Sequence, residues 1–417
     1  MKIRILPAFA AILALTTTDA LAQPPATPTP GPGRGAMAPL KSPEVSADGR
    51  VTFRLRAPNA KEVLVTGLAP GQRPAMQKDE QGVWSLTTEP MKPDMYGYSF
   101  NMDGANFNDP GNPNFKTSAF GAGQSQVHVT NGTPVSWEPA PGIARGAVAH
   151  HFYHSALIGD DRDYYVYTPP NYEPNRKEPY PVLYLLHGLG DDAAGWVTAG
   201  AANVILDNLI AQGKAKPMIM VNTLGYGVAN MMSDGRGGRG GGPGVIGGEK
   251  MIPNFAAAVV EEVMPQVEKQ YRVTKDRTQR AIAGLSMGGA EALFTGLNHQ
   301  DKFAWVASFS GAFVMWPGAV NPAAAGRGGG RGGMAALDTA VFEKNFPNLA
   351  KTNSQLKLLW IACGTDDGLI GVNRQFKEWL KTKDVHFTEA EVPGMAHVWP
   401  LWRQNLTELA PRLFQGR

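Results

Sequence analysis

The stretch Arg280–Gly289, which reads RAIAGLSMGG, constrains this chain more than any other. An apolar run leads into a G-x-S-x-G pattern, and a helix-forming run, AEALFTGL, follows it. A strand, a tight turn and a helix in that order predict a nucleophile elbow, in which small neighbours leave a serine exposed on a strained turn. The alternative is a glycine-rich turn whose serine only caps the helix. We expect Ser286 to be a nucleophile.

The N-terminus has the pattern of an export signal. Two basic residues precede an apolar segment, Ile5–Leu15, and small residues surround a plausible cleavage position before Gln23. This pattern predicts a signal peptide over residues 1–22 and therefore a periplasmic or secreted protein. Residues 23–40 are rich in proline and predict an extended linker. No later apolar run is long enough to span a bilayer, so no membrane contact is expected after signal removal.

Composition excludes some classes of function. A formal net charge of +3 over 417 residues gives no basic signature of a nucleic-acid partner. The length predicts two domains. Cys363 is the only cysteine and lies in an apolar run, so it cannot pair within the chain and is expected to be a buried thiol. The oligomeric state remains open.

Residues 41–136 predict a small all-β domain. Short β-rich segments separated by Gly, Pro, Asp and Asn turns are typical of a sandwich. The predicted strands lie in residues 51–58, 61–68, 82–89 and 96–104. The segments VTFRLRAPNAKEVLV and YGYSFNMDG resemble the immunoglobulin-like early-set (glycogen-binding-like) domains that precede many carbohydrate-active enzymes. Trp84 and Tyr98 are candidates either for stacking on sugar rings or for filling the sandwich core.

Residues 145–417 predict an α/β domain, because strands and helices alternate and imply a mostly parallel sheet covered on both faces. Residues 137–149 are expected to be a connector. Expected strands lie in 163–170, 180–188, 217–222, 280–285, 304–311, 356–364 and 386–392. Expected helices lie in 201–213, 255–271, 369–381 and 399–409, and Pro265 is expected to kink the second of them.

Two glycine- and arginine-rich insertions, residues 235–244 and 323–334, interrupt this order. They are expected to form loops at the carboxyl ends of strands. Their arginines can attract an acidic polymer, or the loops can be solvated surface without a role. The four arginines are Arg236, Arg239, Arg327 and Arg331.

A serine nucleophile needs a base to accept its proton. His397 follows a predicted strand and a short loop just ahead of the last helix, which is the edge of the sheet where a base must lie. We therefore expect His397 to act as general base and then general acid. His187, before Gly188, is expected to shape a turn instead. His150, His151 and His154 are expected ahead of the first strand of this domain, and no carboxylate set supports a metal site there.

The third member of the site should be a carboxylate that orients the imidazole. A predicted strand ends in two adjacent candidates, Asp366 and Asp367. Neighbouring side chains on an extended chain diverge, so only one of them can face the histidine. The residues alone barely separate them. The order Ser286, Asp367, His397 matches the serine, acid, histidine order of α/β-hydrolases.

The oxyanion of the tetrahedral intermediate needs two preorganised N–H donors. The amide of Met287, directly after the nucleophile, is the first expected donor. The second is expected from the loop LLHGLGDD, where we favour the Leu189 amide and keep Gly188 and Gly190 as alternatives.

Residues 150–414 resemble the esterase group of α/β-hydrolases that includes carbohydrate esterase family 1 and the related enterochelin esterases. The resemblance rests on VYTPPNYEP, YPVLYLLHGLGDDAAGW, RAIAGLSMGG, CGTDDGLI and GMAHVWPLWRQNL. It implies Asp367 as the acid, supports Ser286 and His397, and implies ester decorations of plant polysaccharide as substrate. The family often has an aspartate after its histidine, where this chain has Val398.

The leading hypothesis is an exported serine esterase that removes feruloyl or acetyl groups from a polysaccharide such as xylan, without metal or cofactor. The first alternative is an esterase of siderophore or other small esters. The second is a carbohydrate-binding protein without activity.

Overall fold

The computed structural model describes residues 40–68, 71–121, 123–130, 132, 134–229, 248–319 and 337–415. The predicted signal peptide, the linker up to residue 39 and both glycine- and arginine-rich insertions lie outside these ranges. The chain from Leu40 onward forms one compact unit. Among the described helices, none combines the length and apolar character needed to cross a membrane.

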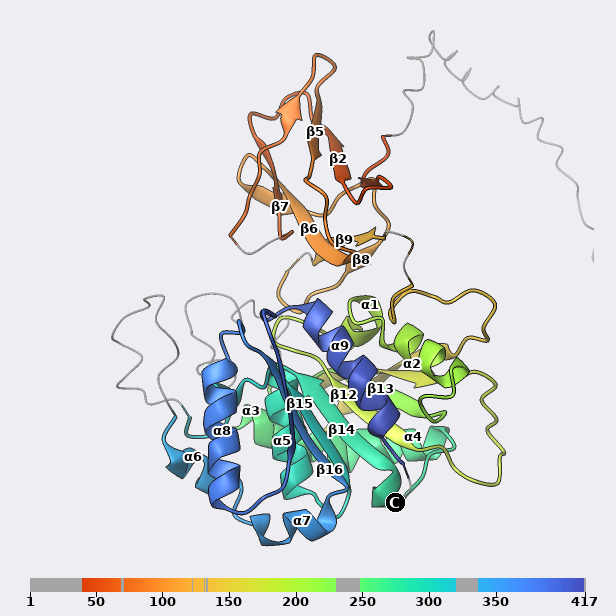
Figure 1. Ribbon diagram of the computed structural model, residues 1–417, viewed down its shortest axis with the longest axis vertical. Coiled ribbons are helices and arrows are strands. Elements are labelled where there is room, and N and C mark those ends of the chain that lie inside the picture. Colours follow the sequence, from red (N-terminus) through yellow and green to blue (C-terminus); the bar gives the residue numbers. More distant parts are fainter. Residues whose placement is uncertain are drawn as a thin grey trace, which may run out of the picture. The chain divides into compact units, whose positions relative to one another are not determined.

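The N-terminal part is an antiparallel sandwich (Figure 1). Its first sheet has the order β1 (Glu44–Val45), β2 (Val51–Arg56), β5 (Val83–Thr87) and β4 (Gln77–Lys78). The second has the order β3 (Val63–Thr66), β6 (Asp94–Met102), β9 (Gln124–Val129) and β8 (Phe115–Lys116), with β7 (Ala105–Phe107) beside β6. The four strands predicted from the sequence correspond to β2, β3, β5 and β6.

The two candidate sugar-binding aromatics fill the sandwich core. Trp84 and Tyr98 are buried, and the Tyr98 ring centroid lies 4.6 Å from that of Phe53. Their polar atoms bond inside the domain, because the Trp84 indole donates to the Ala57 carbonyl at 2.9 Å and the Tyr98 hydroxyl donates to a carboxylate. Neither ring is available to stack on a sugar.

The C-terminal part is built on an eight-stranded sheet of the described chain, with order β10-β11-β13-β12-β14-β15-β16-β17. The strands are β10 (Ala147–Ser155), β11 (Asp160–Thr168), β12 (Val182–Leu186), β13 (Ile219–Thr223), β14 (Arg280–Leu285), β15 (Trp305–Phe309), β16 (Leu358–Gly364) and β17 (Thr388–Val392). The pairs β10–β11 and β11–β13 are antiparallel, and all other neighbours are parallel. The predicted α/β fold with a mostly parallel sheet is confirmed.

One sequence prediction about this sheet was wrong. His150, His151 and His154 do not precede the first strand, because they lie within β10, and the connector is correspondingly shorter. β10 is an edge strand with an exposed face, so its sequence lacks the apolar alternation of a half-buried strand. Each histidine has a hydrogen-bond partner: His150 bonds Asp163, His154 bonds Asp161 and His151 bonds Tyr271.

Helices cover both faces of the sheet (Figure 1). The bounds are α1 (Gly195–Thr198), α2 (Ala202–Ala211), α3 (Met251–Ala258), α4 (Met264–Gln270), α5 (Met287–Asn298), α6 (Thr339–Asn345), α7 (Thr352–Gln355), α8 (Ile370–Thr382) and α9 (Trp399–Leu409). Residues of α3, α4, α5 and α8 join one hydrophobic core, and residues of α2 and α9 join the other. Successive residues of β12 pack alternately into the two cores. Tyr184 and Leu186 belong to the first core, and Leu183 and Leu185 belong to the second.

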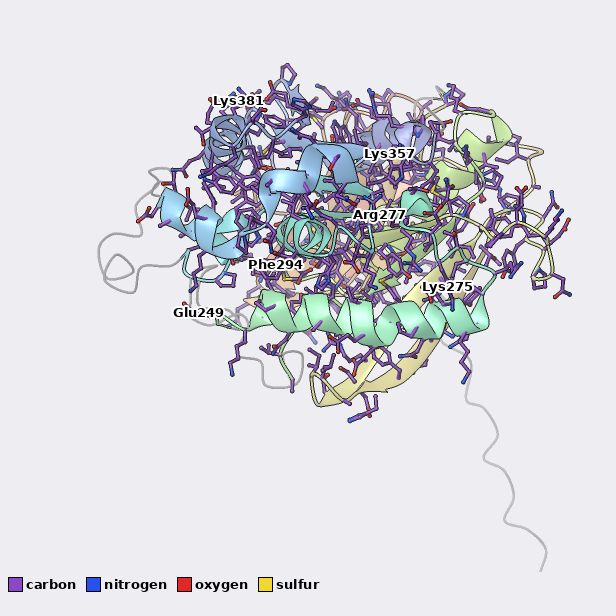
Figure 2. The ribbon with its side chains drawn as sticks, turned by 90° about the horizontal axis from the view of Figure 1, so that it is seen from below. Glu249, Lys275, Arg277, Phe294, Lys357 and Lys381 are labelled. Carbon is purple, nitrogen blue, oxygen red and sulfur yellow. The ribbon has the colours of Figure 1, made fainter. Side chains whose placement is uncertain are left out.

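The predicted helix 255–271 is longer and contains a local irregularity. In Figure 2 the helical ribbon from Met251 to Gln270 runs without a break between the labelled residues Glu249 and Lys275. A π-helical turn, Val259–Val263, separates α3 from α4 and ends two residues before Pro265. Proline lacks an N–H and clashes with the carbonyl four residues earlier, which accounts for the widened turn at this position.

Candidate active site

Ser286 lies at the turn between β14 and α5. Its backbone has φ +54° and ψ −115°, a region that non-glycine residues rarely occupy. Two hydrogen bonds hold this conformation: the Ser286 amide donates to the Phe309 carbonyl and the Ala312 amide donates to the Ser286 carbonyl, both at 2.8 Å. The predicted strand–turn–helix is therefore present, and its serine is strained rather than a relaxed helix cap.

The glycines around Ser286 are required by close backbone contacts. A Cβ atom on Gly288 would lie 2.5 Å from the His187 carbonyl oxygen and 2.6 Å from that of Leu186. Because both contacts are backbone atoms of β12 and its loop, no side-chain rotation can relieve them. A larger residue would push α5 away from the sheet.

Gly288→Ala is expected to lower the free energy of unfolding by about 1–3 kcal/mol through overpacking. Gly371→Ala is the matched control, because a Cβ there meets nothing within 4 Å and alanine favours the helix. Urea denaturation measures both. Equal stability of the two variants would contradict the packing argument.

The structure brings Ser286, His397 and Asp367 together at the carboxyl edge of the sheet, where hydrogen bonds join them. His397 Nε2 lies 3.0 Å from Ser286 Oγ, and His397 Nδ1 lies 2.8 Å from Asp367 Oδ2. The imidazole also meets the Trp402 ring edge-on, with centroids 4.9 Å apart. Ser286 follows β14, Asp367 follows β16 and His397 follows β17. These strands are parallel, so their carboxyl ends lie at one edge of the sheet.

Asp367 and Asp366 have different environments. Asp367 is buried, and its second oxygen accepts a hydrogen bond from the Leu369 amide at 2.8 Å. Burial acts to raise the pKa of Asp367, but the hydrogen bond and charge of His397 outweigh it and hold this pKa below the ordinary value. Asp366 is exposed and bonds Thr365. Of the two carboxylates, Asp367 is the one placed to orient His397.

Ser286 and His397 border two cavities. The smaller, of about 240 Å³, is mainly apolar. The larger, of about 680 Å³, reaches both Trp399 and the sandwich residue Tyr96. The smaller is lined by Leu189, Ala312, Val314, Met315, Gly368 and Leu369 with the three groups of the site. Trp196 and Trp316 are buried in the two hydrophobic cores.

The loop after β12 carries the expected oxyanion donor Leu189 and is held from behind. The Gly225 amide donates to His187 Nε2, and His187 Nδ1 lies within hydrogen-bond distance of the Gly188 carbonyl, both at 2.8 Å. Because Nε2 accepts, Nδ1 carries the proton and donates. Burial lowers the pKa of His187, which keeps this neutral tautomer. His187 thus shapes the loop, as expected from its position before Gly188.

Tyr226 is a second support of this loop that the sequence did not single out. Its hydroxyl accepts from the Gly190 amide at 2.9 Å and donates to the Asp191 carbonyl at 2.8 Å. Gly190 has φ +86°, which glycine adopts without strain. No local pattern marks Tyr226, since its partners lie about 35 residues earlier in the chain.

Glu291 lies on α5, one turn beyond the nucleophile, and is completely buried. Within the described residues neither of its oxygens has a hydrogen-bond partner. Burial raises the pKa of Glu291 well above its ordinary value of 4.5, so the carboxyl is held neutral. This burial is unusual, because glutamate side chains mostly lie at the surface of proteins.

Glu291→Gln is expected to raise stability more at pH 8 than at pH 5. The folded chain holds the Glu291 proton more tightly than the unfolded chain, since its folded-state pKa is raised. The contribution of Glu291 to the free energy of unfolding is therefore fully present below about pH 4.5. It is lost as the pH rises toward the folded-state pKa. Thermal melts at the two pH values measure the difference. An equal change in melting temperature at both would contradict a neutral buried carboxyl.

Comparisons with known proteins follow the same division of the chain. The family model described as "Putative esterase" matches residues 155–413, and that of carbohydrate-binding module 48 (isoamylase N-terminal domain) matches residues 41–121. An endo-1,4-beta-xylanase/feruloyl esterase of Xylanibacter ruminicola is 30% identical over 378 residues. The match covers 89% of this chain and 46% of that protein, so the chain spans about half of its relative's length.

Solved structures have the same architecture. A ferulic acid esterase is 25% identical with a TM-score of 0.51, covering 65% of this chain and all of that one. An enterochelin esterase of Shigella flexneri is 18% identical with a TM-score of 0.62, covering 89% of this chain and 94% of that one. At that identity, the second likeness shows the fold alone.

The strand order, the elbow and the three hydrogen-bonded groups define an α/β-hydrolase preceded by an all-β module. The esterase model matches more than half of the chain. The chain belongs to this esterase family.

Proposed function

We propose that this protein is an exported serine esterase that hydrolyses feruloyl or acetyl esters on plant cell-wall polysaccharide such as xylan. The observation that carries the proposal is the hydrogen-bonded chain from Ser286 through His397 to Asp367, at 3.0 and 2.8 Å. The named activity of the Xylanibacter ruminicola relative supports the substrate class.

In the proposed mechanism Ser286 Oγ attacks the ester carbonyl while His397 Nε2 takes its proton. Asp367 accepts a hydrogen bond from Nδ1–H and stabilises the imidazolium that forms. The amides of Leu189 and Met287 stabilise the oxyanion. His397 returns the proton to the leaving sugar oxygen, and the ester C–O bond breaks. Water then attacks the acyl-enzyme by the same steps in reverse, which releases the acid.

The two cavities suggest where each half of the substrate binds. We place the acyl group in the smaller cavity, whose aliphatic lining suits an apolar group. We place the sugar in the larger cavity, where Trp399 and Tyr96 offer rings and Arg73 and Gln72 offer hydrogen-bond donors. This division matches the chemistry of each half, since sugars present hydroxyl groups beside apolar ring faces.

The remaining sequence predictions belong to the same proposal. Signal removal after residue 22, a linker over 23–40, a sandwich over 41–136 and a catalytic domain over 145–417 fit an enzyme that meets an insoluble polymer outside the cytoplasm. The match to carbohydrate-binding module 48 supports a carbohydrate substrate.

A substrate panel with purified protein tests the assignment. We expect kcat/KM on feruloylated or acetylated xylo-oligosaccharide to exceed that on a catecholate triester by at least about 100-fold, because hydrogen-bonding sites reject ligands that leave their polar groups unpaired. Preference for the triester would favour the siderophore alternative. No turnover of any ester would favour a protein that only binds carbohydrate.

A further inference from the structure

The loop Gly188–Asp191 is held from the N-terminal sandwich as well as from behind. After β8, the chain runs directly against it. The Ala119 amide donates to the Gly190 carbonyl oxygen at 3.1 Å, and the Ser118 hydroxyl donates to the same oxygen at 2.9 Å. One carbonyl of the loop therefore accepts two hydrogen bonds from the sandwich.

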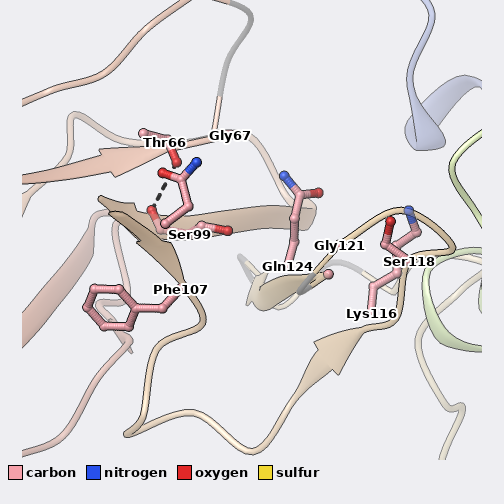
Figure 3. Close-up of a pocket in the computed structure, with 10 residues that line it drawn as sticks. Thr66, Gly67, Ser99, Phe107, Lys116, Ser118, Gly121 and Gln124 are labelled. Carbon is pink, nitrogen blue, oxygen red and sulfur yellow. Dashed lines mark hydrogen bonds between the residues drawn. The ribbon is translucent and has the colours of Figure 1, made fainter. Parts of the chain in front are cut away.

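An ion pair adds a third tie. The Lys116 ammonium pairs with the Asp191 carboxylate, and both side chains are largely buried, with 16% and 8% exposed. Figure 3 shows Lys116 and Ser118 close together at the end of the sandwich cavity that they both line. Removal of one member of a buried pair leaves the other charge uncompensated, so the loss of Lys116 would act directly on Asp191.

Apolar contacts continue this attachment into the core of the α/β part. Ala119 is buried in the core of the α/β part, and the ring centroids of Phe120 and Tyr226 lie 5.5 Å apart. Tyr226 holds the Gly190 amide, whereas the sandwich holds the Gly190 carbonyl. The two peptide groups of Gly190 are thus fixed from opposite modules.

These contacts act on the residue next to the expected oxyanion donor. The Leu189 amide belongs to the peptide group whose Gly188 carbonyl bonds His187 and accepts from the Asp191 amide. The direction of the Leu189 amide therefore depends on where the backbone of Gly190 and Asp191 is held. Donors for an oxyanion work only when they are preorganised. A misplacement of about 1 Å costs on the order of 10²-fold in rate.

We propose that Lys116, Ser118 and Ala119 are positioning residues for the oxyanion hole. The sandwich then takes part in ester hydrolysis itself, beyond any contact with a polymer. This inference rests on the proposed role of the Leu189 amide. If the proposal holds, the rate of hydrolysis of an ester too small to reach the sandwich must still depend on Lys116, Ser118 and Ala119.

The test is hydrolysis of 4-nitrophenyl acetate by the full chain carrying Lys116→Met or Ser118→Ala. We expect kcat to fall about 10–100-fold, with KM changed less than about twofold. Phosphonylation by a fluorophosphonate should slow by a similar factor, because it also develops charge on an oxygen in that site. Lys116→Arg should restore most of the rate. Lys61→Met, an exposed lysine of the same sandwich, is the matched control and should match the wild type.

A second comparison separates positioning from loss of stability. In the double variant Lys116→Met with Asp191→Asn no buried charge is left unpaired, so the melting temperature should recover while kcat stays low. Recovery of kcat together with the melting temperature would overturn the proposal, as would an unchanged kcat in both single variants. Failure of the catalytic assignment has a different signature, namely normal activity in Ser286→Ala.

Discussion

Ser286→Ala is expected to lower kcat for ester hydrolysis by about 10⁵–10⁶-fold. Without Oγ no acyl-enzyme can form, and only water activated by His397 remains to attack the carbonyl. The oxyanion donors would still act, so a small acceleration over the uncatalysed reaction should persist. Steady-state rates on 4-nitrophenyl acetate, with protein freed of trace wild type, measure the loss.

Ser354→Ala provides the control for this variant. Ser354 is exposed, and its hydroxyl donates only locally, to the Lys351 carbonyl at 2.8 Å. Its kcat should equal that of the wild type. A Ser286→Ala protein that keeps more than about one hundredth of the wild-type kcat would show that another group is the nucleophile.

Asp367→Asn is expected to lower kcat by about 10³–10⁴-fold, while Asp366→Asn should change it less than twofold. The asparagine amide offers N–H to His397 Nδ1, which favours the wrong tautomer and removes the charge that stabilises the imidazolium. The pKa of Asp367 is held below its ordinary value, so the wild-type carboxylate stays charged at neutral and alkaline pH. The deficit of Asp367→Asn should therefore persist across neutral and alkaline pH.

The adjacent pair makes this a sharp comparison. Both substitutions remove one carboxylate from the same turn, but only Asp367 is buried against His397. Melting temperatures should be measured together with the rates, because Asp367 also accepts a hydrogen bond from the Leu369 amide and its loss can lower stability. Equal losses in the two variants, or a larger one in Asp366→Asn, would contradict the assignment.

Local patterns predicted the elbow and, apart from β10, the succession of strands along the C-terminal part of the chain. Ser286 and its neighbouring glycines are marked within ten residues, because the strained turn itself demands small side chains. The parallel strands were visible as short apolar runs, since both faces of the sheet are buried. The choice between Asp366 and Asp367 needed either the family resemblance or the direction in which the chain leaves β16, which no short pattern encodes.

The supports of the site could not be predicted in this way. Lys116 and Asp191 are distant in sequence, and either one alone resembles an ordinary surface charge. Glu291 is buried without a partner, against the usual preference of glutamate for solvent. β10 was missed because an exposed edge strand carries polar residues where the signal requires apolar ones. These features depend on tertiary contacts.

The most direct test of the central claim is to identify the residue that a fluorophosphonate modifies. Wild-type protein would be inactivated to completion, digested and mapped by mass spectrometry. The geometry predicts one adduct, on Ser286, whose formation is slowed in Asp367→Asn and abolished in Ser286→Ala. Complete inactivation with the adduct on another residue, or full esterase activity with no adduct at all, would contradict it.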